Sequence, residues 1–146
     1  MTRLILDSGA IDRFARPHPE APANFAELKN SEFWPPLIHT VVLAECLTGR
    51  QQNDARTNRF IKTCELFEDL PEEIGRRAAE LRTQAGQGSV VDALLVALAE
   101  PDGIVLTDDN NDIEALASHT RGVKVVSTMP SKTRPTRRAR SRKRRR

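Results

Sequence analysis

Aromatic residues are scarce in this sequence: they make up 4% of the 146 residues, with no tyrosine and a single tryptophan. A core built from Leu, Val, Ile and Ala suits helices packed on a parallel sheet better than an aromatic-rich β-sandwich. The length is sufficient for one domain and too short for two well-formed cores. We therefore expect a single α/β domain.

Cysteine and long apolar runs are equally sparse. The two cysteines, Cys46 and Cys64, lie in apolar stretches without CxxC spacing, which predicts core residues in a reducing compartment and argues against a disulfide framework or zinc site. The start, MTRLILDSGA, lacks a signal-peptide pattern, and no stretch approaches the roughly 18 apolar residues of a membrane span. We expect a soluble, cytoplasmic protein.

Several familiar catalytic motifs are also missing. The sequence contains no G-x-S-x-G motif and no phosphate loop of the Walker type, and His18, His39 and His119 lack metal-ligand spacing. His39 follows an expected strand and could line a cleft, although a structural role is the better interpretation. The segment Gly86-Gln87-Gly88 is more typical of a helix break than of a phosphate cradle.

Charge is distributed very unevenly along the chain. Residues 131–146 carry ten of the 23 Lys and Arg and no acid, so residues 1–130 hold the other 13 together with all 20 acids. From Ser127 onward, Pro, Ser, Thr and Arg dominate, a composition that cannot bury enough apolar surface to fold. We expect a folded domain at 1–128 and a basic, disordered tail at 129–146, which either binds RNA phosphates or is simply solvated.

Strand and helix patterns alternate along the remaining chain. Strands are expected at 3–6, 37–39, 66–67, 104–107 and 123–126. Helices are expected at 8–14, 23–29, 41–48, 52–64, from Pro71 until the glycines at 86 and 88, at 90–100 and at 110–118. Thr40 and Ser89 can each cap the helix that follows, and Gly49 can end the 41–48 helix. The long connections between strands predict a mainly parallel sheet of four to five strands.

Two acids interrupt otherwise apolar helices. Asp92 is the only polar residue in VVDALLVALA, and Glu45 is the only charged residue in VVLAECL. A helix that is apolar on nearly all sides is buried, and a buried carboxylate must pair, shift its pKa or bind a metal. The Ser89–Asp92 spacing also fits a capping box, which alone slightly favours a cap for Asp92. Glu45 has no capping role, so an ion pair with a distant Arg or a metal is left for it.

Two further acids follow apolar strands. Asp7 follows RLIL and Asp109 follows IVLTD, at the strand ends where ligands bind in open parallel sheets. Helix capping explains either residue alone better than a ligand role does. If all four acids converge, each pair about 4 Å apart repels by roughly 4 kcal/mol at an effective dielectric near 20, which requires a cation. All-oxygen ligands select Mg²⁺ or Mn²⁺.

Four segments together resemble a known family. LILDSGA, VVLAECLTG, SVVDALLVALA and VLTDDNNDIEALA, in this order, resemble the four signature segments of PIN-domain ribonucleases, and most closely those of VapC-type toxins of bacterial toxin–antitoxin pairs. The resemblance spans about residues 3–126 and implies an α/β/α sandwich. The fourth family segment commonly reads Thr-Ser-Asp-Pro-x-Asp. Here Asp108 stands where Ser is usual and Asn110 replaces Pro, so Asp108 competes with Asp109 for the fourth position.

The resemblance also implies an activity. It implies an Mg²⁺- or Mn²⁺-dependent endoribonuclease, with Asp7 and Asp92 as principal ligands and Glu45 and Asp109 binding a second ion or holding waters. Supporting residues around the acids would be Ser8, Thr107 and Asp112. It further implies a small antitoxin that blocks the site, and a homodimer.

Two other functions stay open at this level. One is a non-catalytic nucleic-acid-binding protein that uses the basic tail, with the acids serving as helix caps. The other is a phosphoacceptor receiver domain, which also clusters Asp at strand ends. A receiver needs a Lys at a late strand end, whereas Lys124 lies inside the expected 123–126 strand.

Overall fold

A computed structural model of the chain describes residues 2–17, 19–108 and 110–128. Its centre is a five-stranded sheet in the order β3-β2-β1-β4-β5, in which every neighbouring pair is parallel. The strands are β1 (Leu4–Leu6), β2 (Leu37–His39), β3 (Glu65–Phe67), β4 (Ile104–Thr107) and β5 (Lys124–Ser127). The predicted α/β class and parallel sheet are confirmed. The predicted tail and its boundary lie outside the described residues.

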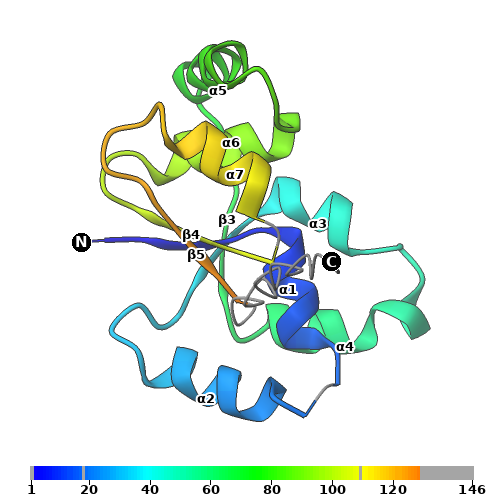
Figure 1. Cartoon of the computed structure of the whole chain (residues 1–146). Helices are drawn as coiled ribbons and strands as arrows, with labels where there is room; N and C mark the ends of the chain where they lie inside the picture. Colours follow the sequence, from blue (N-terminus) through cyan, green and yellow to red (C-terminus); the bar gives the residue numbers. More distant parts are fainter. Residues whose placement is uncertain (1, 18, 109, 129–146) are drawn as a thin grey trace, which may run out of the picture.

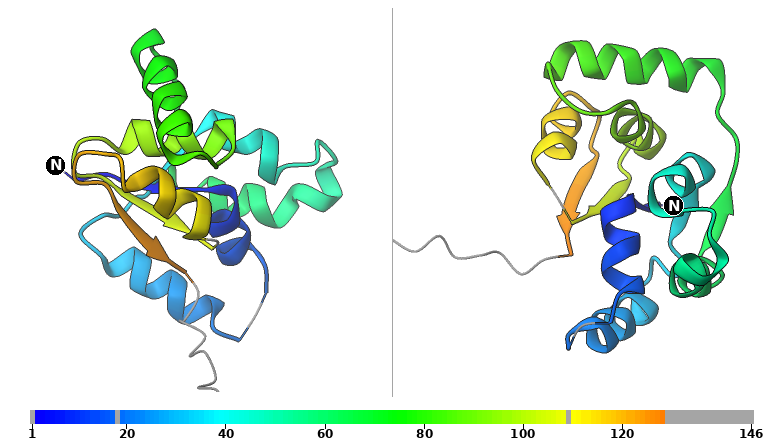
Figure 2. Two further views of the ribbon diagram at one scale, coloured as in Figure 1. Left: turned by 45° about the horizontal axis from the view of Figure 1, so that its top comes forward. Right: turned by 90° about the vertical axis from the view of Figure 1, so that its right-hand side faces the viewer.

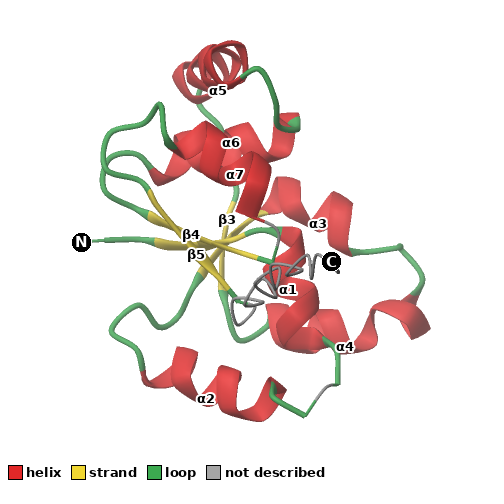
Figure 3. Cartoon of the chain, viewed as in Figure 1, coloured by secondary structure: helices red, strands yellow, loops and turns green. Residues whose placement is uncertain are grey.

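Helices cover both faces of this sheet. They are α1 (Ser8–Ala15), α2 (Ala21–Asn30), α3 (Thr40–Cys46), α4 (Gln51–Ile61), α5 (Glu72–Ala85), α6 (Val90–Ala99) and α7 (Asn110–Ala117). Figures 1 and 3 show α6 and α7 on one side of the strands and α1, α2 and α4 on the other. Helix α5 packs outside α6 and α7 (Figure 2). The arrangement is a three-layer α/β/α sandwich, as expected.

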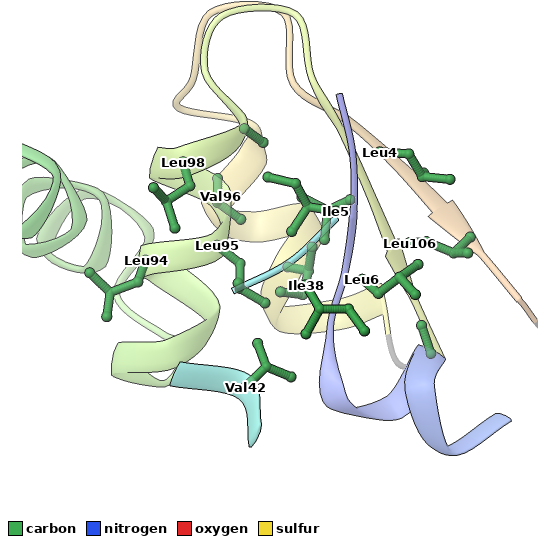
Figure 4. Close-up of a cluster of buried hydrophobic side chains, with 14 of the residues drawn as sticks. Leu4, Ile5, Leu6, Ile38, Val42, Leu94, Leu95, Val96, Leu98 and Leu106 are labelled. Atoms are coloured by element: carbon green, nitrogen blue, oxygen red, sulfur yellow. The ribbon is translucent and has the colours of Figure 1, made fainter. Parts of the chain in front are cut away.

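The core lies where the central strands meet α6. Leu95 and Val96 of α6 and Ile5 of β1 are fully buried, and in Figure 4 they lie on the same side of the sheet. Leu4 and Leu106 lie on the opposite side, because successive side chains of a strand point to opposite faces. Aliphatic side chains dominate this core, as the composition predicted. No helix in the described part of the chain is both long and apolar enough to cross a bilayer.

Helix α3 begins and ends differently from the prediction. Its N-cap is His39, whose Nδ1 accepts the Val41 N–H at 3.1 Å, and Thr40 is already helical. The helix ends at Cys46 because the Asp54 carboxylate accepts the N–H groups of Thr48 and Gly49 at 2.9 Å each, which holds that segment in a turn. The structural role favoured for His39 is confirmed: it is buried and also contacts the Asp69 carbonyl oxygen at 3.1 Å.

Candidate metal centre

The acids of interest gather at one edge of the sheet. Because all five strands are parallel, their carboxyl ends share that edge. Asp7 directly follows β1 and Asp108 directly follows its neighbour β4, and the Asp7 N–H donates to the Leu106 carbonyl at 3.1 Å. Lys124 is the first residue of β5, at the opposite edge, so the lysine that a receiver domain requires is not beside these acids.

Asp7 is the most buried of these acids, with 8% of its surface exposed. Its side chain caps α1 by accepting the Ala10 N–H at 2.7 Å. Burial, followed by the nearby charges of Asp92 and Asp108, outweighs the hydrogen bonds from Thr107 and Ala10 and raises the pKa of Asp7 to about 6. The fold therefore holds a carboxylate where its negative charge is unfavourable.

Asp92 occupies the first turn of α6 and closes a capping box. Its backbone N–H donates to Ser89 Oγ at 3.0 Å, and its Oδ2 accepts the Ser89 N–H at 3.4 Å. The capping interpretation of Asp92 is thus confirmed. Its charge nevertheless acts on both Asp7 and Glu45, raising the pKa of each. Asp92 is the electrostatic link between the strand edge and helix α3.

Glu45 is not buried, and the expectation that it lies within a buried helix is wrong. Helix α3 has only seven residues, and Ala44 and Glu45 both lie on its exposed side. The short helix packs against α1 through its other side. Partial desolvation, and then the charge of Asp92, raises the pKa of Glu45. Glu45 therefore borders the acidic edge from solvent, and it does not need a distant arginine to be tolerated.

The fourth acidic position is only partly described. Asp109, the predicted fourth acid, lies outside the described residues. Its competitor Asp108 is exposed, and its Oδ1 accepts a hydrogen bond from Thr128 Oγ1 at 3.1 Å. A Cβ atom built on Gly9 would lie 3.0 Å from Asp108 Cβ and 3.5 Å from Asp7 Oδ1. Glycine at this position of α1 leaves room for Asp108 beside Asp7, a tertiary contact that the sequence did not reveal.

The three predicted supporting residues differ in their surroundings. Thr107 is fully buried, and its side chain hydrogen-bonds Asp7. Ser8 is half-buried, and the structure shows no hydrogen bond from its side chain to another described residue. Asp112 is exposed in the first turn of α7. Among the acids that the structure describes, Asp7 thus has a side-chain hydrogen bond from one of the three, Thr107.

The described side chains do not form a ready-made chelate. Within residues 2–17, 19–108 and 110–128, no three His, Cys, Asp or Glu side chains are grouped closely enough to hold a metal ion. The chemistry of the acids still suits a hard cation, because Asp7, Asp92 and Asp108 offer only oxygen donors and the charges of Asp92 and Asp108 act on Asp7. A divalent ion would compensate the burial and the repulsion that together raise the pKa of Asp7.

The cysteines do not contribute to this site. Cys46 and Cys64 are free thiols that pack against the core, as predicted. Burial raises the pKa of each thiol to about 11, which keeps both protonated at neutral pH. Neither is suited to bind a metal or act as a nucleophile.

Comparison with solved structures gives the fold a name. No protein-family model matches the chain, and no curated protein sequence is significantly similar to it. PAE2754 from Pyrobaculum aerophilum matches with TM-score 0.57 and 13% identity over 85% of this chain and 83% of that one. FitAB bound to IR36 DNA matches with TM-score 0.59 and 20% identity, over 85% and 94%. DNA-bound VapBC from Salmonella typhimurium matches with TM-score 0.60 and 14% identity, over 87% and 98%.

The chain has a PIN-domain fold. All three solved structures are PIN-domain toxin–antitoxin proteins. They share the architecture and little of the sequence, so the similarity supports the predicted fold and leaves each acid of this chain to be judged by its own geometry.

Proposed function

We propose that this PIN domain is a divalent-metal-dependent endoribonuclease and the toxin of a type II toxin–antitoxin pair. The observation that carries the proposal is the buried position of Asp7 at the carboxyl edge of a PIN-fold sheet, where burial and two further acids raise its pKa to about 6. Such perturbed carboxylates are typical of functional sites. The fold likeness to toxin–antitoxin proteins and the order of the four acidic sequence segments point in the same direction.

The reaction would be hydrolysis of an RNA phosphodiester, in which water adds to phosphorus as the bond to the leaving oxygen breaks. When bound, Mg²⁺ or Mn²⁺ would supply charge neutralisation at the phosphate and a more acidic water. Asp7 and Asp92 would be the principal ligands, and Glu45 and Asp109 would complete the ligand set, with Asp108 as the alternative to Asp109. Thr107 would orient Asp7 through its hydrogen bond.

Two of the proposed ligands, Asp7 and Asp92, hydrogen-bond backbone groups at helix starts. The Ala10 N–H fixes Asp7 at the start of α1, and Ser89 fixes Asp92 at the start of α6. These contacts limit the side-chain freedom that metal binding would otherwise have to remove.

A metal-dependence assay tests the proposal directly. Purified protein is incubated with end-labelled single-stranded RNA, or DNA of the same sequence, in Mg²⁺ or Mn²⁺ and with EDTA. We expect RNA cleavage that EDTA abolishes and that Asp92→Asn reduces at least a hundredfold. The matched control is Asp102→Asn, in the turn that precedes β4 at the opposite edge of the sheet, which should cleave normally. Cleavage that survives EDTA or Asp92→Asn would refute the metal-nuclease proposal.

The partner of the domain follows from the same proposal. The FitAB and VapBC structures are complexes that include an antitoxin. We expect a small antitoxin that covers the acidic edge of this chain and inhibits cleavage, and a homodimeric toxin. Co-expression with the product of the adjacent reading frame, followed by size-exclusion chromatography with light scattering, measures both. A monomer that binds no such product would contradict this part of the proposal.

One alternative has an observation in its favour. The concentration of ten Lys and Arg within residues 131–146 suits a non-catalytic nucleic-acid-binding protein. In that case, the acids would be helix caps only. RNA binding without cleavage under every metal condition, abolished when those ten residues are neutralised, would favour it over the nuclease.

A further inference from the structure

A surface pocket lies at the end of α1 that is remote from Asp7. It measures about 450 Å³, and its lining residues come from the C-terminal end of α1, from α2 and from α4 with the residues that directly follow α1 and α4. Helix α1 packs against both α2 and α4, and in Figures 1 and 2 it runs from the strands toward them. We call this site the α1–α2–α4 pocket. Its volume falls in the range of small-ligand pockets, roughly 300–1,000 Å³.

The charged residues that line this pocket are all positive. Arg16, Arg56 and Arg59 line it, and none of the described residues that line it is acidic. Arg56 and Arg59 are exposed on one face of α4, and neither forms an ion pair with an acid of the described part of the chain. Arg16 faces Asp12 at 3.7 Å with its side chain 77% exposed, a pair that contributes little to stability. Three guanidinium groups are therefore available to an anion.

Aromatic rings form the apolar wall of the same pocket. Phe14 and Phe60 stack with their centroids 5.3 Å apart, and Phe25 meets Phe60 at 6.2 Å with the rings steeply inclined. All three line the pocket, and Phe14 and Phe25 are only half-buried, so part of each side chain is accessible. The sequence has five Phe, one Trp and no Tyr, so half of its aromatic residues meet at this one place.

Helix α1 determines how far the pocket lies from the acidic edge. Asp7 is the N-cap of α1 and Arg16 is its C-cap. At 1.5 Å per residue, the nine steps between them correspond to roughly 13 Å along the helix axis. About four nucleotides of a stacked single strand cover this distance, and fewer of an extended one.

We propose that the α1–α2–α4 pocket holds one unpaired nucleotide of the RNA substrate, a few positions from the cleaved bond. The proposal rests on the nuclease function proposed above. In it, Arg16, Arg56 and Arg59 bind phosphate oxygens, and the base lies against Phe14 and Phe25.

The electrostatics of the domain and the chemistry of the pocket both favour this ligand. The acidic edge repels a polyanion, so cations beyond that edge must hold the strand. Guanidinium groups pair with phosphate in a bidentate way, and proteins that bind single strands combine such cations with aromatic side chains on which bases stack. The aromatic wall favours a nucleotide over an acidic peptide, which would use the charges alone. A base-paired nucleotide cannot place its base against the rings, so we expect cleavage of unpaired RNA.

The salt dependence of binding tests the pocket without requiring catalysis. The full chain carrying Asp7→Asn is titrated against a labelled 20-nucleotide RNA in EDTA, at 50 to 400 mM KCl, by fluorescence anisotropy. Arg56→Gln combined with Arg59→Gln should flatten the plot of log Kd against log salt by up to about 1.4, roughly 0.7 for each phosphate that is no longer neutralised. Changing both to Lys should keep most of the slope. The matched control combines Arg3→Gln with Arg76→Gln, which removes the same charge from exposed positions outside the pocket. An unchanged slope in the pocket variant, or an equal fall in the control, overturns the proposal.

Cleavage at one mapped bond tests the aromatic wall. In the otherwise unaltered chain with Mg²⁺, abasic residues are placed one at a time along the RNA. One position, about two to four nucleotides from the cleaved bond, should raise KM at least fivefold. In Phe25→Leu that penalty should disappear, because no ring is left for the base to lose. Phe33→Leu, a half-buried Phe that packs on the core outside the pocket, is the matched control and should keep the penalty. A penalty that persists in Phe25→Leu refutes the pocket and leaves the nuclease standing.

Two further outcomes separate this proposal from its neighbours. If no form of the chain cleaves RNA, the nuclease proposal fails, and the salt slope still decides whether the pocket binds a single strand. If the Arg56 and Arg59 double Gln variant binds RNA normally but no longer co-purifies with the co-expressed antitoxin, the pocket belongs to a protein partner and the proposal is overturned.

Discussion

Replacing Asp7 by Asn should stabilise the protein while abolishing the proposed nuclease activity. The native pKa of about 6 lies above the reference value of 3.8 because burial, Asp92 and Asp108 outweigh the hydrogen bonds that Asp7 accepts. At about 1.4 kcal/mol per pKa unit, the ionised side chain costs the native state up to about 3 kcal/mol at pH 7. Asn has nearly the same shape, caps helices as well as Asp does, and carries no charge. Most of that cost should therefore be recovered.

The stability difference between Asp7→Asn and the wild type should depend on pH. Because the native pKa is the higher one, the native state binds more protons than the unfolded state between about pH 4 and 6, so wild-type stability falls as pH rises through this window. The advantage of Asp7→Asn should be near zero at pH 4 and complete above about pH 7. For a domain of this size, the gain corresponds to a rise in Tm of roughly 10 °C at most.

Thermal and urea unfolding in EDTA from pH 4 to 8 measure this gain. The matched control is Asp12→Asn on the same helix, since the Asp12 side chain is 42% exposed and faces Arg16 at 3.7 Å. That control should not stabilise the protein. Adding Mg²⁺ should raise the Tm of the wild type more than that of Asp7→Asn, by mass action on the native state. An Asp7→Asn variant that is no more stable than wild type at pH 7 would refute the electrostatic reasoning.

Three further predictions follow from other contacts. Gly9→Ala should crowd Asp108, because the new Cβ would lie 3.0 Å from Asp108 Cβ. We expect kcat/KM for RNA cleavage to fall about tenfold. The free energy of unfolding in urea should stay nearly unchanged, because a gain in helix propensity of roughly 1 kcal/mol offsets the crowding. Glu100→Gln weakens the bidentate pair with Arg77, at 2.8 and 2.9 Å, and should cost roughly 1–2 kcal/mol in urea at pH 7. The pair with Arg77 lowers the pKa of Glu100 from its ordinary value of 4.5, so this difference should shrink as pH falls below that value. His39→Ala removes a buried side chain with two hydrogen bonds to backbone groups and should cost roughly 3 kcal/mol in urea without altering the metal requirement of cleavage.

Local sequence patterns predicted the order of helices and strands well, because most elements here have local signals at their ends. Ser89 caps α6, as predicted, and Gly86 ends α5 with a positive φ of 67°. The errors occur where a residue farther along the chain determines where an element ends. The turn after α3 depends on Asp54, which is part of the next helix, and no capping rule applied to residues 40–49 includes it. The strand order also depends on tertiary packing, and the sequence did not predict it.

The candidate acids also divide into those that local sequence features predicted and those whose position depends on tertiary packing. Asp7 and Asp92 were identified because a strand end and an apolar helix are local features of the sequence. The burial of Glu45 was wrong because the apolar composition of a seven-residue helix does not tell which side faces solvent. The place of Asp108 depends on its contact with Gly9, about a hundred residues earlier in the chain, which only the folded chain reveals.

Capping and metal binding are not competing roles for these acids. A carboxylate has two oxygens with about four acceptor positions, and a cap uses one of them. Asp7 accepts the Ala10 N–H through Oδ1, and Asp92 accepts the Ser89 N–H through Oδ2. Each cap contributes roughly 1 kcal/mol, which offsets part of the repulsion between the acids while no ion is bound. The helix starts therefore make it possible for the fold to hold these charges together. Asn at position 7 keeps the side-chain hydrogen bonds to Ala10 and Thr107 and removes the charge, whereas Ala removes all of them, so the difference in stability between the two variants measures these hydrogen bonds separately from the charge.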